Sequence, residues 1–200
     1  TPPARRVNRQ GLGPNACGAP AVAEGRVVDT NVLIVASAAD HGSPFPEHAT
    51  PVEEADLRLR VLDWLRAFEI DSTRHAVWDW DWHICGEYQK QLTEQDYGWL
   101  AMMTKRDKNE VAWVGIQVDA NGHGVLPPAL TVGVSDLDDR KMVAAVLVAP
   151  PEVHPCRLTV ACDTDWLDCE PALTAAAIET ELILEDWLRA KWAEKRFPGP

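Results

Sequence analysis

The chain has 200 residues, of which 46% are hydrophobic and 25% charged, and its net charge at pH 7 is −12. This is the composition of a globular domain with a full hydrophobic core rather than of a disordered or fibrous chain. The acidic balance argues against a general nucleic-acid binder, which would present a basic surface. It does not exclude an enzyme that acts on nucleic acid, because bound divalent cations can offset a cluster of acids.

Neither a membrane span nor an export signal is predicted. The apolar runs at 32–35 and 143–148 are short and flanked by charges, and the stretch at 17–24 is too rich in small residues for an export core. The five cysteines are odd in number and form no CxxC pair, which predicts reduced thiols rather than a disulfide framework or a zinc site. We therefore expect a cytoplasmic protein that does not contact membranes.

We expect three regions along the chain: a mobile arm at 1–24, one domain at 25–195 and a short tail at 196–200. The arm is rich in Pro, Gly, Ala and Arg and has no periodicity. Its arginines Arg5, Arg6 and Arg9 are interpreted as solvated residues, with contact to phosphate as the alternative.

The domain opens with the string RVVDTNVLIVAS at 26–37. Val27 and Val28 predict a buried parallel strand, and Thr30 begins a helix, so Asp29 lies at the carboxyl end of the first strand. In open α/β sheets this edge is where ligands bind. The alternative is that Asp29 simply caps the following helix, since Asp is a preferred capping residue.

A proline-rich loop at 41–51 precedes an amphipathic helix at 52–68. In the segment VWDWDWHICGEYQKQL at 77–92, we expect a short extended entry and then a helix from Trp82 that Asp81 caps. The alternating tryptophans are interpreted as core, and a platform for base stacking is the alternative.

Two apolar runs between 111 and 134 flank an Asn121-Gly122 turn, which predicts a β-hairpin insertion with His123 as a solvated turn residue. The remaining elements are predicted in order: a helix at 139–149, a strand at 156–162, a helix near 171–177, a strand around 181–184 and a helix at 185–195. Strands that alternate with helices predict an α/β fold with three layers, in which helices cover both faces of a mostly parallel sheet.

Acidic residues recur at the boundaries of these elements. Asp29 and Asp163 follow predicted strands, Asp139 begins a helix, and Glu87 lies among apolar neighbours inside the tryptophan-rich helix. Acids at strand ends and helix starts of a parallel sheet converge on one rim, and such like charges need a counter-ion. The pattern therefore predicts a site for hard cations, Mg²⁺ or Mn²⁺.

At this point the chain resembles the PIN-domain ribonucleases, including toxins of the VapC type. The resemblance rests on four strings: VVDTNVLI, ICGEY, SDLDDRKMVAAVL and TVACDTDWL. The string TELILEDWL is similar to the closing strand and helix of that family, so the resemblance covers about 26–192. It implies a PIN-like fold.

The resemblance also implies an acidic pocket that is both catalytic and metal-binding. Its four main members are Asp29, Glu87, Asp139 and Asp163, and Asp165 and Asp138 are further candidates for metal ligands. Asp139 is preferred over Asp138 because it precedes the apolar pair Met142-Val143 by three residues, as in the family. Three residues close to this rim in the sequence, Asn31, Arg140 and Lys141, are candidates to hold the substrate backbone. Arg140 and Lys141 are explained equally well as solvated residues at a helix start.

The expected function is a metal-dependent endoribonuclease that hydrolyses RNA phosphodiester bonds. Glu87, expected to be the least solvated of the acids, is either a metal ligand or the group that takes the proton from water. Whether the chain is the toxin of a toxin-antitoxin pair, whether an antitoxin or another protein binds it and whether it forms a homodimer stay open. The alternative is a catalytically weak PIN-like module that binds protein or RNA. A small-molecule phosphohydrolase would need a second acid where Asn31 stands.

Overall fold

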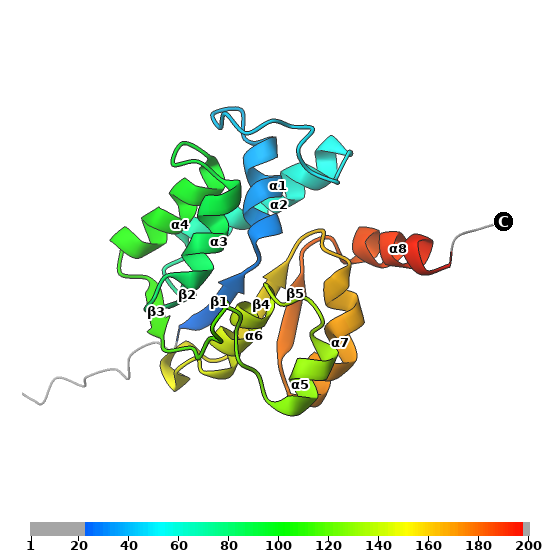
Figure 1. Ribbon diagram of the computed structural model, residues 1–200. Coiled ribbons are helices and arrows are strands. Elements are labelled where there is room, and N and C mark those ends of the chain that lie inside the picture. Colours follow the sequence, from blue (N-terminus) through cyan, green and yellow to red (C-terminus); the bar gives the residue numbers. More distant parts are fainter. Residues whose placement is uncertain (1–22, 198–200) are drawn as a thin grey trace, which may run out of the picture.

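The computed structural model describes residues 23–197, which form one α/β unit (Figure 1). Its helices and strands have the following bounds: β1 (Glu24–Val28), α1 (Thr30–Ala39), α2 (Ala55–Ile70), β2 (Arg74–Asp79), α3 (His83–Gln91), α4 (Tyr97–Asp107), β3 (Val111–Val114), α5 (Pro128–Gly133), α6 (Arg140–Leu147), β4 (Cys156–Val160), α7 (Asp165–Ala175), β5 (Glu179–Leu182) and α8 (Glu185–Arg196). A short 3-10 turn spans Pro151–Val153. No helix in this part of the chain is both long and apolar enough to cross a bilayer.

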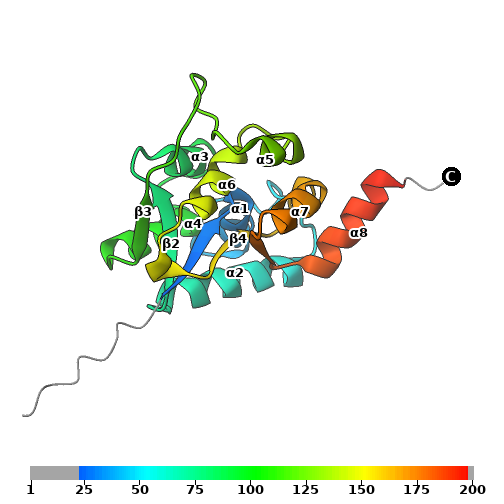
Figure 2. The same cartoon turned by 90° about the horizontal axis from the view of Figure 1, so that it is seen from below.

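The five strands form one sheet in the order β3-β2-β1-β4-β5, and every neighbouring pair is parallel. Helices α1, α2 and α4 pack against one another, while α6 packs on β1, β2 and β4. Figure 2 shows α2 on one side of the sheet and α6 and α7 on the other. The predicted three-layer α/β/α architecture is confirmed.

The order of the strands fixes where a ligand site is expected. After β1 the chain moves outward through β2 to β3, and it then returns to place β4 on the opposite side of β1. The direction of winding therefore reverses between β1 and β4, and ligands of open α/β sheets bind outside the carboxyl ends of the strands at such a point. Asp29 follows β1 and Asp163 follows β4, so the fold brings both acids to this position.

The central strand β1 is buried except at Glu24, as a strand covered on both faces should be. Its one charged interior residue, Arg26, is only 3% exposed. The Arg26 guanidinium donates to Glu24 and Glu181, both at 2.7 Å, and to the Gly25 carbonyl at 2.9 Å. Glu181 also accepts from the Trp64 indole at 2.9 Å, so this buried network connects β1, β5 and α2.

Several boundaries differ from the sequence-based expectations. The helix predicted near 171–177 already begins at Asp165 and ends at Ala175. The arm predicted at 1–24 ends earlier, because Glu24 already belongs to β1 and Ala23 is buried. Arg5, Arg6 and Arg9 lie outside the described residues, as do residues 198–200 of the predicted tail, whereas Arg196 ends α8. The helix after the tryptophans is capped by Asp79, not Asp81: the Asp79 carboxylate accepts from the backbone N–H groups of His83 and Ile84, both at 2.9 Å.

For the β-hairpin insertion predicted at 111–134, the two strands are wrong and the turn is confirmed. Its first arm becomes β3, which pairs in parallel with β2, and its second becomes helix α5. Around Asn121-Gly122 the chain does reverse, but the pairing is limited to one antiparallel bridge between Val118 and Gly124. Apolar residues in a short run favour a strand without specifying its partner, and here the partner is the central sheet.

Two deletions should therefore behave differently. Removing residues 112–132 takes away β3 and α5, and we expect it to abolish cooperative unfolding. Removing 119–123 and joining Val118 to Gly124 removes only the turn, and the free energy of unfolding should change by about 0.5 kcal/mol or less. Urea denaturation followed by circular dichroism measures both. A cooperative transition in the long deletion at the wild-type midpoint would show that β3 is dispensable.

Candidate active site

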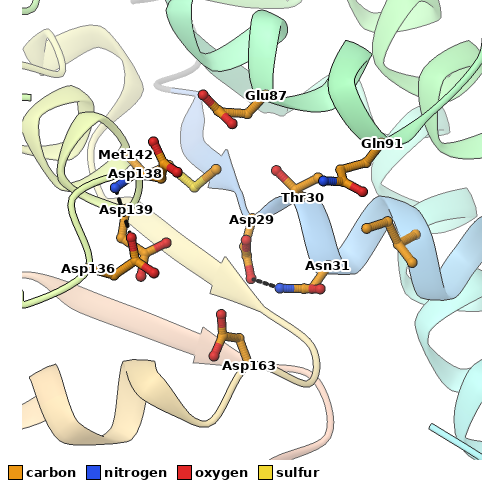
Figure 3. A pocket seen from close by; sticks show the side chains of 11 residues that line it. Asp29, Thr30, Asn31, Glu87, Gln91, Asp136, Asp138, Asp139, Met142 and Asp163 are labelled. Atoms are coloured by element: carbon orange, nitrogen blue, oxygen red, sulfur yellow. Dashed lines mark hydrogen bonds between the residues drawn. The ribbon is translucent and has the colours of Figure 1, made fainter. Parts of the chain in front are cut away.

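An open pocket of about 340 Å³ lies at the reversal point of the sheet (Figure 3). Five of its lining residues were predicted from the sequence as catalytic or metal-binding residues: Asp29, Glu87, Asp138, Asp139 and Asp163. Asn31, predicted to bind substrate, also lines it. In Figure 3, Asp29 lies between Glu87 on one side and Asp163 on the other, while Asp136 and Asp139 approach from the α6 side. The structure thus brings together carboxyl groups from four distant segments.

Asp29 is the most buried acid of the pocket, at 3% exposure. It occupies the N-cap position of α1, but its side chain makes no capping hydrogen bond, and the contact from the Asn31 amide is long at 3.4 Å. Burial and the nearby Asp163 raise the pKa of Asp29 to about 7, although Asn31 offsets part of this effect. The capping alternative for Asp29 is therefore not supported by its contacts.

Asp139 is the second acid of the pocket that lies in an unfavourable environment for a charged carboxylate. It precedes α6, again without a side-chain cap, and its buried Oδ2 has no hydrogen-bond partner. Burial, and then the charges of Asp29, Asp136 and Asp163, raise the pKa of Asp139 to about 9. A buried carboxylate oxygen without a donor is expensive, so this position fits either a proton or a cation.

Asp163 is half-buried, and its Oδ1 accepts the backbone N–H of Asp165 at 2.9 Å. Burial raises the pKa of Asp163, and this backbone hydrogen bond only partly offsets the effect. Asp165, a predicted metal ligand, does not line the pocket: its carboxylate pairs with Lys195 at 2.7 Å. Its position at the first turn of α7 directs it toward α8 rather than toward β1.

Glu87 was expected to be the least solvated acid, and this is wrong. Its side chain is 16% exposed, whereas Asp29 is almost fully buried. Lys141 and Lys90 both donate to the same Glu87 oxygen, Lys90 at 2.8 Å. Burial raises the pKa of Glu87, but the two lysines outweigh it and hold the pKa below its usual value. Glu87 is thus charged and paired, in contrast to the unpaired aspartates opposite.

The two basic candidates for substrate binding have structural partners instead. The Arg140 guanidinium donates to the carbonyl groups of Val134 at 3.0 Å and Thr131 at 2.9 Å, and so fastens the end of α5 to the start of α6. The Lys141 side chain is 4% exposed and pairs with Glu87 and, at 3.6 Å, with Asp138. The prediction that Arg140 and Lys141 hold the substrate backbone is therefore not supported by their contacts.

The loop after β3 braces the acidic side of the pocket. A Cβ on the buried Gly124 would lie 2.5 Å from the carbonyl carbon and oxygen of Arg140. Only glycine lets the loop approach the start of α6 this closely. The segment that carries Asp139 is thus held by Gly124 from one side and by the Arg140 hydrogen bonds from the other.

Three polar residues of the pocket wall were not predicted from the sequence: Thr30, Gln91 and Asp136. Asp138 was predicted as a metal ligand, and the structure shows it also as a partner of Lys141. Asp136 accepts the backbone N–H of Asp138 at 2.8 Å and is exposed. Its signal was present in the string SDLDDR, where three acids precede one helix. Sequence spacing alone could not show that all three would face the same pocket.

The pocket has the ligand types of a cation site, but its carboxylates do not converge on one point. Among residues 23–197, no three His, Cys, Asp or Glu side chains converge closely enough to hold a metal ion together. The donors are nevertheless carboxylates, the oxygen ligands that Mg²⁺ and Mn²⁺ prefer. The unpartnered Asp139 Oδ2 and the raised pKa values of three neighbouring aspartates are the features that a cation would relieve.

Comparison with known proteins adds no family: the chain matches no family model, no curated protein and no solved structure.

Proposed function

We propose that this protein is a metal-dependent ribonuclease of the PIN-domain type, with the acidic pocket as its active site. The observation that carries the proposal is the meeting of Asp29, Asp139 and Asp163 at the reversal point of the sheet, each with a raised pKa. Like charges assembled in a partly desolvated pocket cost stability, and a site that tolerates this cost suggests a function.

In this proposal Asp29, Asp139 and Asp163 are the residues that would hold Mg²⁺ or Mn²⁺. When bound, the cation would activate water and offset the charge that develops on the phosphodiester. Asn31 orients Asp29 through its amide, and Asp139 Oδ2 holds a proton near neutral pH until a cation replaces it. Glu87, kept ionised by Lys141 and Lys90, faces the pocket as a charged acceptor.

A second candidate is the catalytically weak module that binds RNA or protein. One observation favours it: the acids do not converge on a common point in the described part of the chain. In that case the pocket would neither bind a cation tightly nor cleave RNA, and its acids would be tolerated rather than used.

Cleavage of an end-labelled, unstructured RNA separates the two candidates. We expect cutting with Mn²⁺ or Mg²⁺, none with a chelator, and a loss of roughly 100-fold or more in Asp29→Asn, because the variant removes a ligand charge from the pocket. Asp63→Asn is the matched control, since Asp63 is an exposed aspartate on α2. Cutting that persists in Asp29→Asn would point to a contaminating nuclease, and no cutting by the wild type would favour the binding module.

A further inference from the structure

Three tryptophans form an exposed aromatic surface at the β2-β3 side of the sheet. Trp80 is 62% exposed and Trp82 40%, which is unusual for side chains of this size. Trp113 on β3 lies between them: its ring stacks on Trp80 with centroids 5.3 Å apart and planes 20° apart, and it meets Trp82 at 5.8 Å. The sequence-based expectation that the alternating tryptophans are core holds for Trp78 alone, which is 1% exposed. We call Trp80, Trp82 and Trp113 the tryptophan platform.

The backbone holds this platform in place. Trp82 has a φ of +63°, a left-handed conformation that is uncommon for a large side chain. The Asp79 carboxylate fixes the turn by accepting from the first two N–H groups of α3. On the other side, the ring of the buried Trp78 packs against the rings of Trp82 and Trp113, with centroids 6.0 and 5.7 Å apart. Trp78 and the turn at Asp79 thus hold the exposed rings in place, and a ligand does not have to order them.

A groove lies between Trp82, the one platform residue that lines it, and the acidic pocket. It has a volume of about 270 Å³ and extends from Trp82 along α3, past Gly86 and Lys90, to Glu87 and Asp138, which also line the acidic pocket. The turn at Asn121-Gly122 forms its outer wall, and Figure 2 shows this loop standing beside α3. Gly122, which lines this wall, has open space where a side chain would begin.

The groove is less negatively charged than the acidic pocket, so it is better suited to the anionic backbone of a nucleic acid. Lys90 and Lys141 pair with Glu87, and Lys141 also with Asp138, so the formal charges of these four residues cancel in a protein whose net charge is −12. Lys90 is 61% exposed and retains donors beyond its contact with Glu87. An apolar protein partner would have no use for a polar groove of this kind, whereas a nucleic-acid strand has both a backbone for the groove and bases for the rings.

We propose that the tryptophan platform stacks unpaired bases of the nucleic acid whose backbone follows the groove into the acidic pocket; this rests on the proposed nuclease function. Stacking on aromatic rings tolerates any base, because every base has a π face. The platform therefore selects for single-stranded segments beside the cleavage point and not for a particular sequence. Bases held in a duplex are stacked on one another and cannot reach the rings.

Binding of a short labelled oligouridylate, followed by fluorescence anisotropy in a chelator, tests the platform apart from cleavage. Trp82→Gly removes one ring and suits the positive φ, and Trp80→Ala removes the most exposed ring. We expect each variant to weaken binding by roughly 10-fold or more. Trp192→Ala, which changes a tryptophan on α8, is the matched control and should bind as the wild type does. Melting curves confirm that each variant is folded, and Trp80→Ala suffices if Trp82→Gly is not.

An oligonucleotide of the same length with abasic nucleotides completes the cycle. The wild type should bind it as weakly as Trp80→Ala binds the complete strand, and Trp80→Ala should bind both strands alike. Equal binding of both strands by the wild type would show that the tryptophan platform does not stack bases. Dimers of the wild type that are absent in Trp80→Ala would also overturn the proposal, because the rings would then form a contact between two copies of the chain. Binding without cleavage in Mn²⁺ would instead overturn the nuclease, while cleavage by Trp82→Gly and Trp80→Ala at the wild-type rate would overturn the platform alone.

Discussion

Without divalent cations, Asp139→Asn is expected to be more stable than the wild type at pH 8 and no more stable at pH 4. Burial and four neighbouring acids raise the pKa of Asp139 to about 9 in the folded protein, while the unfolded chain has an ordinary value of 3.8. Between these values the native state binds a proton that the unfolded state has lost. The free energy of unfolding of the wild type therefore falls as the pH rises, by up to about 1.4 kcal/mol for each unit.

The variant lacks this titration, so its advantage should be absent below pH 4 and grow toward pH 9. Asp29 and Asp163 titrate together with Asp139, because their charges raise its pKa; removing the Asp139 charge also relieves these two acids, which adds to the advantage of the variant at pH 8. Melting scans at pH 4, 6 and 8 in a chelator measure the effect. A difference in melting temperature that does not change with pH would show that Asp139 is ionised and compensated in the native state.

Excess Mn²⁺ should reverse the order of stability at pH 8. A cation that binds only the native state stabilises it by about 2.7 kcal/mol at a hundredfold excess over the dissociation constant, and the variant loses much of this gain. Equal shifts of both melting curves on addition of Mn²⁺ would place the cation elsewhere.

Lys141→Met is expected to destabilise the protein by about 2–3 kcal/mol at pH 7, somewhat below the usual cost of breaking a fully buried pair. The Lys141 side chain is 4% exposed, and the substitution leaves Glu87, 16% exposed, with only the flexible Lys90 as partner. The lysines depress the pKa of Glu87, so the stability they provide is present above the ordinary value of 4.5 and is lost as the pH falls. The difference between variant and wild type should therefore shrink toward pH 3.

Lys90→Met is the matched control for this prediction. It removes a partner of the same Glu87 oxygen, but Lys90 is 61% exposed, and solvent screens an exposed pair, so the loss of stability should be much smaller than in Lys141→Met. In the double variant Glu87→Gln/Lys141→Met, much of the lost stability should return because no uncompensated charge remains. Urea denaturation of the four proteins measures these differences. Equal losses in Lys90→Met and Lys141→Met would show that burial of Lys141 is unimportant.

The layer architecture was predictable from the sequence because buried parallel strands are almost continuously apolar. Residues 26–28 and 156–160 show this pattern, and the helices between them carry apolar stripes. The α4 helix at 97–107 was missed, and β3 was assigned to a hairpin. The local sequence pattern identified neither element correctly. β3 has four residues, and only its pairing with β2 distinguishes a strand at the edge of the sheet from one arm of a separate hairpin.

The acids of the site were predictable because a boundary between elements is visible in the sequence. Asp29, Asp139 and Asp163 each stand next to one, and the structure places all three in the pocket. The roles of the basic residues were not predictable. Arg140 and Lys141 are adjacent in sequence, yet Arg140 donates to backbone carbonyl groups and Lys141 forms an ion pair, and their partners come from other helices, α5 and α3.

The crowding of carboxylates around the pocket also bears on how fast the RNA substrate that we propose would reach it. Most proteins that bind nucleic acid associate more slowly as salt is added, because salt screens an attraction. Here the pocket and a net charge of −12 repel the incoming phosphates, so screening should help. Moderate ionic strength would then speed the encounter, and divalent cations would lower the same barrier before any of them takes part in chemistry.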